Sequence, residues 1–419
     1  MVESTVNRHR PPIQDPHRPR HALKRTSWRR RLRRRLRRHR RATAVILLAF
    51  AVFFTWLAFS LGGALLNPAL GSSLSSRFAE WARGHGASSI VNWAENEWYS
   101  HHPPRVGGTL PPGLIKNPPA TSQTISTSVP YLPTPKAMVP FATSVVPGEG
   151  DWRPVGRRVD GIPAIYETTL RPDAVHTSYV AGVAWIDTKL LRASLYSGSS
   201  IPGGGPFPLS APIKTSASRT LVAAFNAGFL MDNANGGYYT AGRTEIPLRN
   251  GAASFVVYRN GSANIVAWGN SVTLNHSIVS VRQNLDLLVS NGRPVPGLEA
   301  NDTTKWGFTL GNAVYVWRSG VGITANGALV YVGGPGLNIT DLANLLIRAG
   351  AVRAMELDIN TDWVNFSSYK PSTPGGLASP TNGTELLPSM TGTPARYFET
   401  WWARDFITMS AIKPKTGKA

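Results

Sequence analysis

The longest apolar segment of the chain runs from Ala42 to Leu66 and contains no charged residue. A helix rises about 1.5 Å per residue, so a segment of this length can cross a hydrocarbon core of about 30 Å. The apolar part of a cleaved signal peptide is shorter, about 7–15 residues, and a small-residue cleavage site follows it. The sequence therefore favours a retained transmembrane helix over residues 42–66, with a cleaved signal peptide as the alternative.

Residues 67–102 follow this helix and carry apolar side chains at helical spacing. The apolar face is formed by Phe78, Trp81, Ile90, Trp93 and Trp98. This pattern predicts one or two short amphipathic helices that lie at the bilayer surface or pack on the next domain, with a partner-binding helix as the alternative. Residues 103–150 are rich in Pro, Ser, Thr and Gly and show little periodicity, which predicts a partly extended linker.

From about Asp151 the chain changes to short apolar runs bounded by Gly, Asn, Pro or Asp, which is typical of strands. The predicted strands are Tyr179–Ile186, Leu190–Tyr196, Leu221–Phe225, Ala253–Tyr258, Ile265–Trp268, Leu285–Val289, Phe308–Leu310, Ala313–Trp317 and Ala328–Val332. Asn260-Gly261 and Asn326-Gly327 predict tight hairpins, because Asn-Gly accepts the positive φ that such turns need. Residues 151–419 are therefore predicted to form one domain.

One helix interrupts these strands after Thr340, which is a suitable N-cap, and ends at Gly350. The strand that follows, Val352–Ile359, alternates so that Glu356 and Asp358 share one face, with Cα atoms about 7 Å apart at a rise of about 3.3 Å per residue. Few helices and many strands predict the α+β class, with a mixed or antiparallel sheet behind a single transmembrane helix.

The end of the chain contains a long loop and further strands. Residues 371–394 are rich in Gly, Pro, Ser and Thr, and such a loop inside a compact domain is usually a functional lid or disordered. Two more strands are predicted, over Arg396–Trp401 and Phe406–Ile412.

The net charge of +21 is concentrated in the tail of residues 1–41, which holds 16 Lys and Arg against two acidic residues. Fourteen of the 21 charges therefore lie in the tail, and only seven in the remaining 378 residues. Because this cluster precedes the apolar segment, the tail is predicted to be cytoplasmic and the domain extracytoplasmic. Contact with anionic lipid is favoured over nucleic-acid binding for the tail. The chain has no cysteine, which excludes disulfides, thiol chemistry and Cys-based zinc sites.

Two glycine-containing stretches are candidates for substrate binding. Asn226 and Gly228 stand at the end of a predicted strand, where a ligand could approach the backbone, although Asn-x-Gly is more often a turn. Arg318 and Gly320 belong to a second stretch, in which the guanidinium could hold a phosphate or carboxylate. An ordinary surface ion pair is the alternative for Arg318.

The acidic segment from Glu356 to Asp362 is the third candidate. Its carboxylates, with Asn360 between them, stand at a strand end beside a helix, where catalytic acids or a hard divalent cation such as calcium are found. A solvated loop is the alternative. The sequence contains no G-x-S-x-G, P-loop or H-E-x-x-H motif, so the corresponding enzyme classes lose support.

The order and spacing of these stretches resemble the phosphodiester glycosidase family. The counterparts here are Asn226-Ala-Gly-Phe-Leu230, Arg318-Ser-Gly-Val-Gly322, and Leu342–Ala351 leading into Leu357-Asp358. The Arg-rich tail, the single apolar helix and the phrase Gly350–Asp358 are similar to membrane-anchored actinobacterial members. The resemblance implies an exported hydrolase of sugar-1-phosphodiester linkages in cell-envelope glycans.

The resemblance also implies roles for individual residues. Arg318 would hold the phosphate, Asp358 or Glu356 would act as base, and Asn226 would bind a sugar hydroxyl or the phosphate. The family's glycine run after the Asp is replaced here by Ile359-Asn360-Thr361-Asp362. This difference supports the alternative, a non-catalytic envelope glycan-binding or polysaccharide-assembly protein on the same fold.

Overall fold

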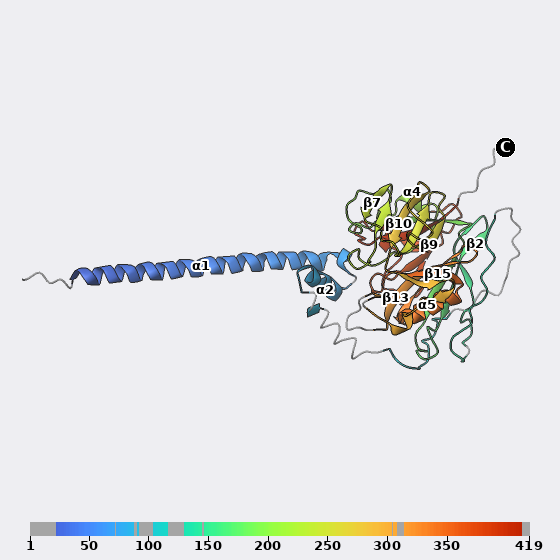
Figure 1. Ribbon diagram of the computed structural model, residues 1–419, viewed down its shortest axis with the longest axis horizontal. Helices are drawn as coiled ribbons and strands as arrows, with labels where there is room; N and C mark the ends of the chain where they lie inside the picture. The colour runs from blue at the N-terminus through green and yellow to red at the C-terminus, as the bar shows by residue number, and fades with distance from the viewer. Residues whose placement is uncertain are drawn as a thin grey trace, which may run out of the picture. The chain divides into compact units, whose positions relative to one another are not determined.

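The computed structural model describes residues 22–71, 73–87, 90–91, 104–115, 130–144, 146–303, 305–307 and 314–412. The chain forms two compact units, one ending at Ala64 and one beginning at Leu65. The first unit contains nearly all of helix α1, Ala22–Leu66 (Figure 1). Within α1, the segment His39–Leu66 is long and apolar enough to cross a membrane, with 28 residues. A membrane anchor and a signal sequence both have this property.

The second unit begins with two short helices. The 3₁₀ helix η1, Pro68–Leu70, leads into α2, Leu74–Gly84. A capping box formed by Ser73 and Ser76 starts α2, since each side chain bonds the backbone N–H of the other. Helix α2 confirms the predicted amphipathic helix, whereas the predicted apolar positions Trp93 and Trp98 lie outside the described residues.

The largest sheet of the second unit has eight strands. Their order is β1-β2-β3-β14-β13-β15-β11-β12. The bounds are β1 Arg153–Val159, β2 Ile162–Leu170, β3 Ala181–Ile186, β14 Leu329–Leu337, β13 Val316–Thr324, β15 Ala351–Glu356, β11 Leu287–Ser290 and β12 Arg293–Pro294.

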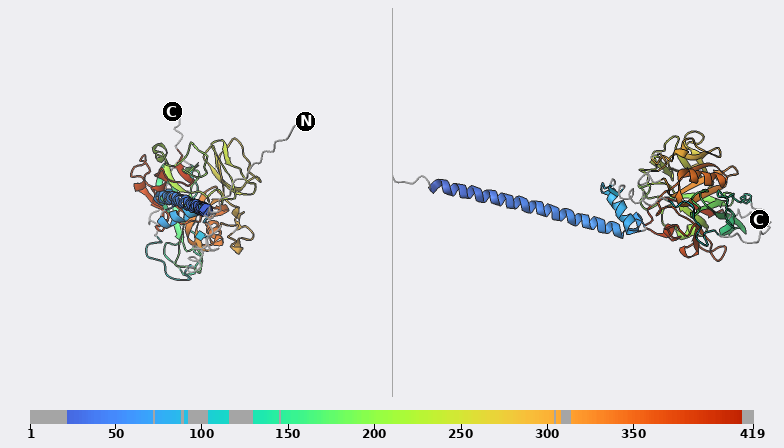
Figure 2. Two further views of the ribbon diagram at one scale, coloured as in Figure 1. Left: turned by 90° about the vertical axis from the view of Figure 1, so that its left-hand side faces the viewer. Right: turned by 90° about the horizontal axis from the view of Figure 1, so that it is seen from below.

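Two five-stranded sheets complete the unit, in the orders β17-β16-β5-β18-β4 and β7-β6-β10-β8-β9. The bounds are β17 Gly383–Glu385, β16 Phe366–Tyr369, β5 Leu221–Asn226, β18 Phe406–Ala411, β4 Leu191–Tyr196, β7 Arg243–Ile246, β6 Tyr238–Thr240, β10 Ile278–Gln283, β8 Ala253–Tyr258 and β9 Ala263–Ala267. The yellow-green strands of the last sheet gather on one side of the unit (Figure 2). Every ladder between these described strands is antiparallel, which confirms the predicted α+β class.

Helix α5, Ile339–Arg348, packs on β13, β14 and β15 of the large sheet (Figure 1). Its buried stripe, formed by Leu342, Leu345 and Leu346, joins the core between helix and sheet. Gly350 follows the helix at φ +97°, as predicted. The predicted N-cap Thr340 is wrong. Asn338 caps the helix instead, because its side chain accepts the N–H of Asp341 at 2.8 Å and makes a capping box with it.

Other elements differ from the sequence prediction. The expected strand over Arg396–Trp401 is wrong, since the 3₁₀ helix η5, Arg396–Phe398, begins there. The loop of residues 371–394 contains 3₁₀ helix η4, Pro380–Asn382, and strand β17. The predicted strand Phe308–Leu310 lies outside the described residues. Two further short helices, α4 Thr215–Ser218 and η2 Leu298–Ala300, connect strands.

The C-terminal part of the predicted linker packs against the large sheet. Leu132 and Met138 are buried in the core under α5. Glu149 forms a buried ion pair with Arg171 at 2.7 Å. The folded structure therefore extends N-terminal to residue 151, because apolar side chains spaced along a Pro-rich segment are enough to hold it on the domain.

Candidate functional site

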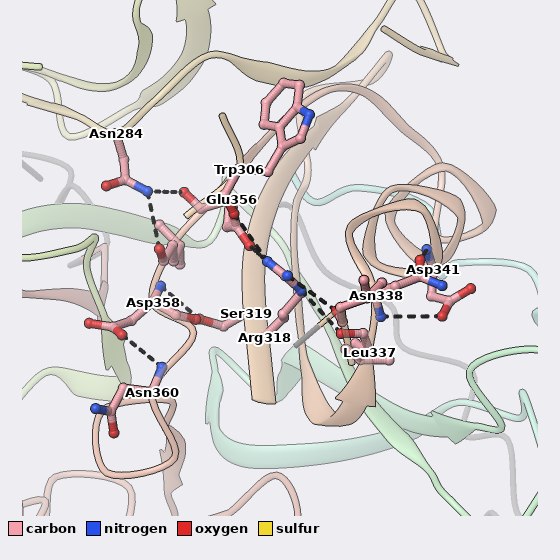
Figure 3. A network of polar contacts seen from close by, with 12 residues as sticks. Asn284, Trp306, Arg318, Ser319, Leu337, Asn338, Asp341, Glu356, Asp358 and Asn360 are labelled. Atoms are coloured by element: carbon pink, nitrogen blue, oxygen red, sulfur yellow. Dashed lines mark hydrogen bonds and ion pairs between the residues drawn. The ribbon is translucent and has the colours of Figure 1, made fainter. Parts of the chain in front are cut away.

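A buried ion pair lies where β13 meets the end of β15. Arg318 Nη1 donates to Glu356 Oε1 at 2.6 Å, and both side chains are almost fully buried. The remaining donors of the guanidinium reach main-chain oxygens, with Nε bonded to Leu337, Nη1 also to Trp306, and Nη2 to Val314 (Figure 3). A substrate phosphate would have to displace these contacts to reach Arg318.

The burial of this ion pair changes the pKa of Glu356. Burial raises its pKa to about 7, although the charge and hydrogen bond of Arg318 act in the opposite direction. Its Oε2 has no hydrogen-bond partner among the described residues. Because Glu356 is fully buried and paired with Arg318, we assign it to the structure of the core.

A chain of hydrogen bonds connects the three candidate stretches. Asn226 Nδ2 donates to Ser319 Oγ at 3.0 Å, and that hydroxyl donates to the carbonyl oxygen of Asp358 at 2.8 Å. The N–H of Asp358 in turn donates to Ser319 Oγ at 3.1 Å. The Oδ1 atom of Asn226 accepts from Tyr331 Oη at 2.9 Å and from the N–H of Asn365 at 3.1 Å. The polar atoms of the Asn226 side chain are therefore used in hydrogen bonds that position the backbone at Asp358.

The two candidate glycines allow close packing around this chain. A Cβ on Gly228 would lie 2.8 Å from Oδ1 of Asn284, whose amide nitrogen bonds the carbonyl oxygens of Glu356 and Leu357. A Cβ on Gly320 would lie 3.0 Å from Leu346 of α5. Both glycines thus allow close packing around the strand that leads to the carboxylates.

The shared face predicted for Glu356 and Asp358 is wrong. Strand β15 ends at Glu356, three residues earlier than predicted. Backbone pairing with Ser319 continues past Glu356, since the N–H of Leu357 donates to Ser319 O at 2.8 Å and the N–H of Ser319 donates to Asp358 O at 2.9 Å. Ser319 thus opposes two successive residues, as in a β-bulge, and the regular alternation stops there. Figure 3 shows the two carboxylates pointing apart, with Glu356 directed to Arg318 and Asp358 to the N–H of Asn360.

Asp358 is 4% exposed and is held at the start of a tight loop. Its Oδ1 accepts the N–H of Asn360 at 3.0 Å, and the Oδ1 of Asn360 accepts the N–H of Asp362 at 2.8 Å. The side chain of Asn360 is exposed. The segment that replaces the family's glycine run therefore orients Asp358 through two successive Asx turns.

Sequence reasoning missed a group of charged side chains from other parts of the chain, namely Arg282, Arg404 and Asp405, which we call the arginine cluster. Arg282 Nε donates to Asp405 Oδ2 at 2.7 Å, and both residues are fully buried. Arg404 is 7% exposed, lies over the ring of Trp363 at 4.6 Å, and keeps a buried Nη1 without a partner among the described residues. The available clue was the position of these charged residues within or directly before apolar strands, Arg282 in β10 and the pair Arg404-Asp405 just before β18.

The arginine cluster influences the pKa of Asp358. Burial raises the pKa of this carboxyl group, and the charge of Arg404 is the largest influence that opposes the shift. Hydrogen bonds from the backbone of Asn360 and Ile359, and then the charge of Arg282, act in the same direction as Arg404. A buried carboxylate under the influence of an arginine that has an unused N–H makes this cluster the candidate site for chemistry on an anion.

The described residues do not form the predicted cation site. In the part of the chain that the structure describes, no group of three or more His, Asp or Glu side chains converges to hold a metal ion. Glu356 is paired with Arg318, and Asp358 points away from it. These two carboxylates therefore do not bridge one cation.

Residues 219–358 match the model of the phosphodiester glycosidase family. The matched segment begins just before β5 and ends at Asp358, so it contains Asn226, Arg318 and Glu356. The chain therefore carries a phosphodiester glycosidase domain over these residues, which confirms the resemblance of the sequence motifs.

Other comparisons are more distant. No curated protein matches the chain. Among solved structures, a hypothetical protein from Synechocystis is similar, with 14% identity, a TM-score of 0.33, and coverage of 62% of this chain and 64% of that one. A protein from Burkholderia pseudomallei K96243 is similar at 12% identity and a TM-score of 0.27, covering 55% of this chain and 74% of its own. The chain thus spans less than two thirds of the Synechocystis protein.

The site makes a prediction about stability. The substitution Arg318→Met should lower the free energy of unfolding by about 3–5 kcal/mol, because it leaves Glu356 buried without its partner. Asp358→Asn should change it by less than about 1 kcal/mol, since the amide oxygen can still accept the N–H of Asn360. Urea denaturation of both variants measures the difference. An Arg318→Met protein as stable as the wild type would contradict the structural role of the pair.

Proposed function

We propose that the protein is an exported, membrane-tethered hydrolase of sugar-1-phosphodiester linkages in cell-envelope glycans. The match of residues 219–358 to phosphodiester glycosidases supports the reaction class. The observation that carries the proposal is the buried Asp358 beside Arg404, whose Nη1 has no partner among the described residues. A buried cation with an unused donor is stabilised when an anionic substrate binds there.

The reaction follows from the charges of these groups. Water attacks the anomeric carbon, the bond from that carbon to the phosphate oxygen breaks, and the electron pair leaves on the phosphate monoester. Asp358 takes the proton of the attacking water, and its charge stabilises the cationic character that develops on the sugar ring. Arg404 holds the phosphate and stabilises the additional charge on the leaving group. Asn226 and Ser319 position the backbone of Asp358 and need not touch the substrate.

The proposed location rests on the N-terminal helix. Its apolar part, His39–Leu66, would anchor the chain in membrane lipid, and the Arg-rich segment before it would remain in the cytoplasm. The domain then faces the envelope, where glycans and sugar phosphodiesters are available. The concentration of positive charge in the tail accounts for the basicity of the chain without nucleic acid as a partner.

One observation favours a second function, non-catalytic glycan binding or polysaccharide assembly. Asn226 and Arg318, to which the resemblance assigns substrate contacts, use their polar atoms in bonds inside the fold. The segment of residues 359–362 also replaces the glycine run of the family. A binding protein would need a site near Asp358 but no proton transfer.

The first test of the proposed function is turnover by the Asp358→Asn variant. The full chain in detergent or nanodiscs is incubated with a panel of methyl esters of sugar 1-phosphates, and released reducing sugar is measured with the phosphate monoester. Loss of the base should lower kcat by about 10²–10⁴-fold. Asp160→Asn is the matched control, since Asp160 is an exposed residue in a turn with φ +48°. Saturable binding without turnover by the wild type would support the second function, and unchanged turnover by Asp358→Asn would contradict the assignment.

The pH dependence gives a second prediction. Because burial raises the pKa of Asp358, kcat/KM should fall on the acid side at a pH above the usual aspartate range, as the base becomes protonated. Arg404→Gln removes the main charge that stabilises the carboxylate, so the acid limb should move to still higher pH. Arg259→Gln, at an exposed position, serves as the control. An acid limb that stays in place in Arg404→Gln would show that Arg404 does not act on the titrating base.

A further inference from the structure

The first residues of the second unit are held together by one arginine. Arg77 of α2 donates from Nη1 to the carbonyl oxygen of Leu65 and from Nε to that of Gly71, both at 2.9 Å. Leu65 belongs to the last turn of the apolar helix but lies in the same compact unit as the sheets. The end of that helix and α2 are therefore fixed to each other within this unit.

This N-terminal segment touches the loop that follows Asp358. Gly71 has φ +152°, and a Cβ placed on it would lie 3.1 Å from Oδ2 of Asp362. Asp362 is connected back to Asp358 through the two Asx turns at Asn360. The five residue-to-residue steps from Leu66 to Gly71 can span at most about 18 Å at about 3.5 Å per residue. Within the second unit, the loop of residues 358–362 thus lies close to its first residues, Leu65 to Gly71.

The same segment presents apolar side chains to solvent. Leu66 is 83% exposed, Leu74 is 65% exposed and Phe78 is 47% exposed. Ala79 and Ala82 of α2 are buried in a small cluster with Val91. A short amphipathic helix directly after a membrane-spanning segment, with its apolar face uncovered, is suited to lie in the lipid headgroup region.

We infer that the site works at the bilayer surface on a glycosyl phosphodiester whose second ester group is a lipid chain. This inference rests on the proposed function and specifies its substrate class. The lipid chain would stay in the hydrocarbon while the phosphodiester lies at headgroup depth, beside the loop of residues 358–362. Water adds to the anomeric carbon, its proton passes to Asp358, and the bond to phosphate breaks, which leaves a lipid phosphate in the membrane and a free sugar.

Confinement to the bilayer should raise kcat/KM for this lipid-linked substrate. An enzyme and a substrate held in one membrane meet at a raised effective concentration, which increases apparent affinity without any new contact. The apolar face formed by Leu74 and Phe78 would keep the site at the correct depth. A water-soluble ester of the same sugar phosphate gains nothing from either effect.

The test compares the farnesyl and methyl esters of one sugar 1-phosphate, with the full chain in nanodiscs that contain anionic and zwitterionic lipid. We expect kcat/KM for the farnesyl ester to be at least about 10-fold higher. The double variant Leu74→Ser/Phe78→Ser should lower the farnesyl value by at least about fivefold and leave the methyl value unchanged. The double variant Val175→Ser/Leu274→Ser, which changes exposed apolar residues elsewhere, is the matched control and should leave both values unchanged.

Each outcome separates the two proposals. Equal kcat/KM for both esters, or an equal loss for both in Leu74→Ser/Phe78→Ser, would overturn the lipid substrate and leave the hydrolase intact. Hydrolysis of neither ester under any condition would overturn the proposed function, and the inference would fall with it.

Discussion

The arrangement of the site depends on the side-chain hydroxyl of Ser319. This group lies in the interior, where an unsatisfied polar atom is costly, and it bonds Asn226 from one sheet and both backbone groups of Asp358 from another. The five-stranded sheet with β5 and the eight-stranded sheet with β13 are thereby joined at one point. Asp358 follows the end of β15 at that junction, and its carbonyl oxygen also accepts the N–H of Ser319 at 2.9 Å, so its position is fixed by β13.

Two carboxylates that are two residues apart have different functions in this account. Glu356 remains in the sheet and is paired with Arg318, which also donates to three main-chain oxygens. Asp358 lies beyond the strand, beside an arginine cluster that retains an unused donor on Arg404. Removal of one partner from a buried pair is costly, which explains why the first pair belongs to folding and only the second group is available for chemistry.

The features predicted correctly from the sequence are those that depend mainly on neighbouring residues, such as turns and helix ends. The hairpin glycines Gly261 and Gly327 have the positive φ that Asn-Gly turns require, and Gly350 ends its helix as expected. Strand β2 was missed because it is buried on both faces and contains Glu167, Thr168 and Thr169, so contrast between apolar and polar positions does not mark it. The N-cap was displaced from Thr340 to Asn338, since both residues are suitable and only the surrounding fold selects one.

The candidate site was also predicted only in part, because its contacts depend on the surrounding fold. Asn226, Arg318 and Asp358 were identified by their order in the chain, and the structure brings their strands together. Their individual roles depended on partners that lie far away in sequence, such as Ser319 for Asn226 and Arg404 for Asp358. No local pattern connects residue 404 with residue 358, so the influence of Arg404 on the pKa of Asp358 could come only from the fold.

The most direct test of the central claim is a crystal structure of the Asp358→Asn protein with a bound sugar 1-phosphodiester. The account predicts that the phosphate contacts the guanidinium of Arg404 and that the anomeric carbon faces the side chain at position 358, while the pair of Arg318 and Glu356 remains closed. A phosphate bound to Arg318, with that pair opened and residue 358 remote from the sugar, would contradict it.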